Sequence, residues 1–91
     1  MLTRDTRLRL ADRAVTRKIG DETAIVDIES GQYFELDAIG TRFLELLEIE
    51  GSIGAVMPLM LREYAVAEED LQTDLVRLSQ EMIDSGLLEQ S

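Results

Sequence analysis

The chain contains 91 residues, 45% of them hydrophobic and 31% charged, which is enough for one hydrophobic core and too little for two. It has no cysteine and no histidine, so disulfides, thiolate or imidazole metal sites, and catalysis by Cys or His are excluded. The net charge of −10 disfavours nucleic acids and anionic membranes as partners, and no apolar run approaches the about 18 residues that span a membrane.

The first half of the chain has the alternating pattern and the turn residues of a β-meander. Three β-type runs are separated by turns that contain glycine: 15–19, 24–28 and 32–36. In the third run, Phe34 and Leu36 share one face, while Tyr33 and Glu35 share the other. We therefore expect three short antiparallel strands.

From Asp37 onward the apolar period changes from 2 to 3.6, which is typical of α-helices. Asp37 and Ser52 are suitable N-caps for a first and a second helix, and Gly51 ends the first. The apolar stripe expected on the first helix consists of Ile39, Phe43, Leu46 and Leu47. Pro58 lies inside the second helix and predicts either a kink or a helix that begins near Pro58.

A third helix is expected over about residues 67–85, with an acidic first turn that suits the helix dipole. Leu71, Leu78 and Met82 are its expected core residues, and Leu75 is as suited to the core as to a surface groove. The order of elements predicts an α+β domain that resembles a winged helix-turn-helix, with three N-terminal strands followed by three helices. We expect one domain over residues 1–91, in which 1–13 is flexible or arm-like.

The charge is unevenly distributed along the chain. Residues 1–18 carry a net charge of +4 and the remaining residues a net charge of −14. A DNA-recognition helix needs Lys or Arg, but the expected third helix has only Arg77 and a net charge of −5. DNA binding is therefore disfavoured, and a neutral or cationic partner such as a peptide suits this surface.

The numerous carboxylates do not form a recognisable catalytic or metal site. Acidic residues on the expected helices are typical of solvated faces and of first turns. The spacing from Asp27 to Asp37 resembles a calcium loop, but Gln32 stands where such a loop needs glycine. We expect no metal, no cofactor and no catalytic residue.

The third strand offers a different kind of site. Gln32, Tyr33, Phe34, Glu35 and Leu36 include neither the Pro nor the Lys that protects an exposed sheet edge. If this strand lies at an edge, a peptide can add to it as a new antiparallel strand. The alternatives are that the N-terminal segment or a second copy of the domain covers the edge.

Several short motifs, taken in their order and spacing, resemble the PqqD family. The family pattern contains G-x-Y-Y-x-L-N, a glycine, an aromatic residue, L-L and D-G-x-T/S-V. The matching positions are Gly31, Tyr33, Phe34, Leu36, Asp37, Gly40, Phe43, Leu46, Leu47, Gly51, Ser52 and Ile53, then Tyr64, Ala65, Val66, Asp74, Leu75, Leu78, Gly86, Leu87 and Leu88. This chain departs from the pattern at Ala67, where the family usually has a helix-capping Asp, Ser or Thr, and at Gly54 and Pro58.

The resemblance implies a non-catalytic, cytoplasmic recognition element for ribosomally made precursor peptides. Such elements hold the leader segment against the third strand and third helix and present the precursor to a modifying enzyme. That enzyme is a radical SAM protein in pyrroloquinoline quinone (PQQ) biosynthesis, or a leader peptidase in lasso-peptide systems. On this basis Gln32, Tyr33, Phe34, Glu35, Leu36, Asp74 and Leu75 are the expected peptide-binding residues.

Alternatives remain open for individual residues and for the function. Asp74 is also placed to pair with Arg77, Phe34 suits the core, and Tyr33 suits either packing or stacking on a peptide. The chain is compatible with a monomer or a homodimer. The rival functions are an adaptor that binds a protein partner through its helices and a winged-helix regulator of DNA.

Overall fold

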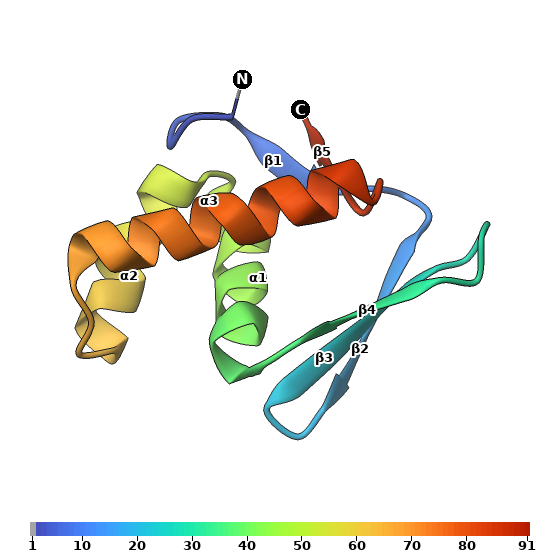
Figure 1. Ribbon diagram of the computed structural model, residues 1–91, viewed down its shortest axis with the longest axis horizontal. Helices are drawn as coiled ribbons and strands as arrows, with labels where there is room; N and C mark the ends of the chain where they lie inside the picture. Colours follow the sequence, from blue (N-terminus) through green and yellow to red (C-terminus); the bar gives the residue numbers. More distant parts are fainter. Residues whose placement is uncertain (1) are drawn as a thin grey trace.

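The structure is a computed structural model that describes residues 2–91. Its elements are β1 (Leu8–Leu10), β2 (Ala14–Ile19), β3 (Glu22–Asp27), β4 (Tyr33–Leu36), α1 (Ala38–Glu50), α2 (Ile53–Glu63), α3 (Glu68–Asp84) and β5 (Leu88–Gln90). The helices lie together, with α3 running across α1, and the sheet of β2, β3 and β4 extends away from them (Figure 1). The expected α+β fold, antiparallel strands followed by three helices, is confirmed.

The larger sheet is antiparallel, and β3 lies in its centre between β2 and β4. Ile25 of β3 pairs with Thr16 of β2 on one side and with Phe34 of β4 on the other. Ile25 is buried, and so are Thr23 and Asp27 on the same face of β3, so this face is directed towards the helices. The three strands agree with the alternation in the sequence to within two residues at each end.

A second sheet joins the two ends of the chain. β1 and β5 are antiparallel, with Leu8 opposite Gln90 and Leu10 opposite Leu88. Leu8 is only 3% exposed, and its N–H donates to the carbonyl of Gly51 at 2.9 Å. The segment 1–13, expected to be flexible or arm-like, thus contributes a strand and a core residue, while residue 1 lies outside the described part. The expected meander lacked β1 and β5 because each has only three residues, too few to show a period.

The starts of α1 and α2 and the end of α1 lie at the capping residues that the sequence indicated. The Asp37 carboxylate accepts the N–H of Gly40 at 2.8 Å, and the Ser52 hydroxyl accepts the N–H of Ala55 at 3.2 Å. Gly51 ends α1 with φ +89°, a left-handed conformation that favours glycine. Ala67 precedes α3 and has no polar side chain to act as a cap.

Pro58 lies within α2 and does not delay its start. The helix begins at Ile53, so the expectation that it begins near Pro58 is wrong. Ile53, Val56 and Met57 precede the proline and are fully buried. Burying each of these side chains stabilises the fold by about 2 kcal/mol, which together exceeds the about 3 kcal/mol that an interior proline costs.

The core is mostly aliphatic and lies between the three helices, the inner face of β3 and the paired chain ends. Its buried side chains come from every helix and from both sheets: Leu8, Ile25, Leu36, Phe43, Leu44, Leu46, Leu47, Ile53, Val56, Met57, Met60, Leu71, Leu75, Met82, Leu87 and Leu88. Phe43 of α1 is the largest fully buried side chain. Elements from both ends of the sequence therefore depend on a single core.

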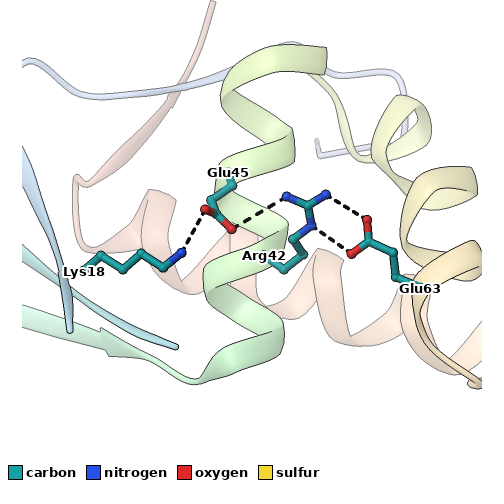
Figure 2. Close-up of polar contacts among 4 residues, drawn as sticks. All are labelled: Lys18, Arg42, Glu45 and Glu63. Atoms are coloured by element: carbon teal, nitrogen blue, oxygen red, sulfur yellow. Dashed lines mark hydrogen bonds and ion pairs between the residues drawn. The ribbon is translucent and has the colours of Figure 1, made fainter. Parts of the chain in front are cut away.

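A polar chain on the surface joins β2 to α1 and α2 (Figure 2). Arg42 of α1 donates two hydrogen bonds to Glu63 of α2, both at 2.8 Å, and lies 3.8 Å from Glu45. Lys18 of β2 reaches Glu45 at 3.3 Å. The Arg42 guanidinium lowers the pKa of Glu63, and the Glu63 carboxylate raises the pKa of Arg42.

None of the helices in the described part of the chain combines the length and the apolar character required to cross a bilayer.

Candidate functional site

An open groove of about 890 Å³ lies between β4 and α3. One wall consists of β4 with the start of α1, and the other consists of the α2–α3 connection and one face of α3. The residues that line it are Phe34, Glu35, Leu36, Asp37, Ile39, Gly40, Ala65, Val66, Ala67, Asp70, Leu71, Asp74, Leu75, Arg77, Leu78 and Glu81.

The floor of the groove is apolar. Leu36, Leu71 and Leu75 are buried there, while Phe34 and Leu78 are partly buried. Such a surface accepts apolar side chains from a ligand, and removal of those side chains from water contributes about 2.5 kcal/mol each.

The rim of the groove is acidic. Asp70, Asp74 and Glu81 follow one another along the exposed side of α3. Arg77 lies among them, and its guanidinium is 3.3 Å from the Asp74 carboxylate. The expected pairing of Asp74 with Arg77 is therefore present, and Asp74 also lines the groove.

β4 is an edge strand, as the strand-addition hypothesis requires. Its partner is β3, and within residues 2–91 no strand pairs with its other side. The Asp27 N–H donates to the carbonyl of Gln32 at 2.8 Å, so the main chain of Gln32 is directed towards β3. The direction of the main-chain N–H and C=O groups alternates along an antiparallel strand, so those of Phe34 and Leu36 are also directed towards β3. The N–H and C=O groups of Tyr33 and Glu35 are then directed outward.

The turn that positions β4 is organised by the buried Asp27. Its carboxylate accepts the N–H of Glu29 at 2.9 Å and the N–H of Ser30 at 3.3 Å, and it forms an ion pair with Arg13 at 3.3 Å. The bond from the Glu29 N–H is the main reason why the pKa of Asp27 lies below its ordinary value, and burial opposes this effect. Asp27 thus fixes the approach of the chain into β4.

Five of the seven expected binding residues line the groove: Phe34, Glu35, Leu36, Asp74 and Leu75. Leu75 is both a core residue and part of the groove floor, so the two alternatives for it are combined in one position. Gln32 lies just before β4 and does not line the groove. Tyr33 does not line the groove either: it lies on the face of β4 opposite Phe34 and Leu36 and is 65% exposed.

Leu71 and Leu78, expected as core residues of the third helix, also line the groove, and Leu78 is only partly buried. Two large exposed apolar residues were absent from the expected site as well. Ile39, expected in the core stripe of the first helix, is 41% exposed and lines the groove instead. Val66, in the connection before α3, is 42% exposed and also lines it. The sequence gives little indication that these two residues are exposed, because their exposure depends on how α1 and the α2–α3 connection pack against β4.

Among residues 2–91, no group of three or more His, Cys, Asp or Glu side chains is arranged to hold a metal ion. What the groove offers is an apolar floor, an acidic rim and an open strand edge with unpaired main-chain groups. These features suit an extended peptide, which supplies main-chain hydrogen bonds at the edge and side chains to the floor.

Comparison with known proteins gives a family and a structural neighbour. Residues 22–88 match the family described as "Coenzyme PQQ synthesis protein D (PqqD)". A solved structure described as "TbiB1 in Complex with the TbiA(beta) Leader Peptide" superposes with a TM-score of 0.83 at 30% sequence identity. The match covers 89% of this chain and 94% of that chain. None of the curated protein sequences compared with the chain matches it significantly.

Proposed function

Since the chain belongs to the PqqD family, we propose that it is a non-catalytic recognition protein for the leader segment of a ribosomally made precursor peptide. It holds the leader in the groove between β4 and α3 and presents the precursor to a modifying enzyme in the cytoplasm. That enzyme is of the radical SAM or leader-peptidase type. The observation that carries this proposal is the open edge of β4 beside a groove with an apolar floor.

The leader adds to the sheet as an antiparallel strand. Tyr33 and Glu35 supply main-chain donors and acceptors to it, and alternate leader side chains are directed to the floor formed by Leu71 and Leu75. The remainder of the precursor stays outside the groove and is accessible to the enzyme. The structural neighbour, described as bound to a leader peptide, supports this mode of action.

The expected affinity is moderate. Main-chain pairing with Tyr33 and Glu35 contributes about 4 kcal/mol and two buried apolar anchors about 5 kcal/mol, while ordering a flexible leader costs about 2–5 kcal/mol. The difference corresponds to a Kd between about 1 mM and about 10 µM, and a third anchor lowers it to the low micromolar range. Such a Kd permits capture and release of the precursor.

Main-chain pairing is tested most directly with proline. We expect Glu35→Pro to weaken binding at least about tenfold, because it removes an outward N–H and places a ring at the edge. The probe is a set of fluorescent peptides that tile the leader regions of the short reading frames adjoining the gene. Binding is measured by fluorescence anisotropy, and circular dichroism checks that the variant is folded.

Two controls separate the edge of β4 from general effects. Glu35→Ala keeps the N–H and should change the Kd less than about threefold. Thr16→Pro places proline on the outer edge of β2, remote from the groove, and should leave binding unchanged. If no tile binds, or if Glu35→Pro binds as well as Glu35→Ala, the proposal is wrong.

A further inference from the structure

The groove carries a strong negative charge above its apolar floor. The residues that line it include the acidic residues Glu35, Asp37, Asp70, Asp74 and Glu81 and one basic residue, Arg77, so together they carry a net charge of −4. Walls of low dielectric constant concentrate such a field in a cleft. Such a field favours a ligand with positively charged groups.

Three of these carboxylates form neither an ion pair nor a hydrogen bond within residues 2–91. Asp37 accepts the N–H of Gly40, and Asp74 pairs with Arg77. In the described part of the chain, no ion pair involves Glu35, Asp70 or Glu81. A ligand with positively charged side chains can supply the missing partners.

Asp70 and Glu81 are the first and the last of the acidic residues that α3 contributes to the groove lining. Asp70 and Glu81 are eleven positions apart on one helix, which corresponds to about 16 Å at 1.5 Å per residue. An extended peptide rises about 3.3 Å per residue, so about five residues cover the same length. Alternate side chains of an extended peptide share a face, so two side chains that are four or six residues apart are both directed towards α3.

We propose that the groove selects an extended peptide with two Lys or Arg residues separated by four or six positions and apolar residues between them. One basic side chain pairs with Asp70, the other pairs with Glu81, and the apolar side chains contact Leu71 and Leu75. This inference rests on the proposed function, because it specifies the leader that the groove accepts.

Charge also decides between this occupant and the other candidates. A second copy of the chain carries a net charge of −10 and would bring its own acidic groove to this one. Nucleic acid is a polyanion and is repelled for the same reason. An apolar peptide without basic residues fits the floor but leaves Asp70 and Glu81 without partners.

The inference is tested by selection from a random displayed peptide library. The library is selected on the wild-type chain, and peptides that still bind Glu35→Pro are discarded. We expect the remaining sequences to contain Lys or Arg pairs at a separation of four or six. In an enriched peptide, replacing both basic residues with Gln should weaken binding about tenfold at about 20 mM salt, at about threefold per ion pair. At about 500 mM salt the loss should be under about threefold.

A double variant with a matched control assigns the effect to α3. The double variant Asp70→Asn/Glu81→Gln should bind the enriched peptide (the Lys form) and its Gln-substituted form (the Gln form) with equal affinity. The control Glu48→Gln/Glu69→Gln changes the net charge by the same amount at exposed residues outside the groove. Like the wild type, it should bind the Lys form of the peptide about tenfold more tightly than the Gln form at about 20 mM salt.

The outcomes distinguish this inference from the proposed function. If the enriched peptides depend on the edge of β4 but lack basic pairs, or if the Gln form binds as tightly as the Lys form, the charge selection is wrong and the function stands. If no enriched peptide depends on the edge, both are wrong.

Discussion

Asp27 shows how a single buried carboxylate can organise the turn that leads into an edge strand. It is the last residue of β3, directly after the apolar run 24–26, and its side chain binds the N–H groups of Glu29 and Ser30 and the guanidinium of Arg13. The bonds to Glu29 and Ser30 are local, of the type that Asp commonly forms at turns. The pairing with Arg13 is long-range and depends on the register of β2 with β3. The sequence therefore permits the turn to be predicted, but not the burial of the carboxylate.

We expect Asp27→Asn to destabilise the protein at neutral pH and to have a smaller effect in acid. Because the pKa of Asp27 lies below its ordinary value of 3.8, the ionised carboxylate is favoured in the folded state. Its contribution is present above the unfolded pKa and is lost as the pH falls through the lower folded pKa. Urea unfolding of both proteins at about pH 7 and about pH 3 measures this difference.

Glu29→Gln is the control, because Glu29 is exposed and only its main chain bonds to Asp27. It should leave the free energy of unfolding nearly unchanged at both pH values. An equal loss of stability for Asp27→Asn at both pH values would contradict the ionic role of this carboxylate.

At the scale of elements, the start of α3 differs from the starts of α1 and α2, because it lacks a side-chain cap. Ala67 occupies the N-cap position with an extended backbone, φ −70° and ψ 137°, and offers no oxygen to the first N–H groups of the helix. Glu68, Glu69 and Asp70 compensate in part, since acidic residues in the first turn interact favourably with the helix dipole.

We expect Ala67→Ser to raise the free energy of unfolding by about 1 kcal/mol, because a serine hydroxyl at this position can accept an N–H of the first turn. Chemical denaturation measures the change. Ala65→Ser adds the same hydroxyl two residues earlier, where no helix begins, and should change stability by less than about 0.5 kcal/mol. If both variants have equal stability, the capping argument is incorrect.

The three longer strands and all three helices could be predicted because each has a clear local signal. Alternation, glycine turns and the caps at Asp37 and Ser52 determine them almost to the residue. The continuous course of α2 through Pro58 could not be predicted, because it depends on burial of Ile53 and Val56 in the tertiary core. For the groove, the shared face of Phe34 and Leu36 could be predicted from the alternation in the strand. The wall formed by the α2–α3 connection could not, because only the tertiary structure brings this connection close to β4.

At the scale of the whole molecule, the two ends of the chain form one unit. β1 pairs with β5, and the N–H of Ala11 donates to the carbonyl of Leu87 at 2.9 Å. The basic residues at the start of the chain face acidic residues from its second half, since Arg4 approaches Glu68 at 4.0 Å and Arg9 approaches Glu89 at 2.7 Å. The charge asymmetry was visible in the sequence, but the partners were not, because each pair joins residues far apart along the chain.

We expect Leu8→Ala to lower the free energy of unfolding by about 2–5 kcal/mol, because it leaves a cavity where β1 meets the core. Ile49→Ala removes an apolar side chain that is 75% exposed, and should change stability by about 0.5 kcal/mol or less. Both are measured by denaturant unfolding under identical conditions. Leu8 does not line the groove, so the folded fraction of Leu8→Ala should bind peptide with unchanged affinity. If Leu8→Ala and Ile49→Ala have equal stability, residues 8–10 behave as the arm that the sequence first suggested.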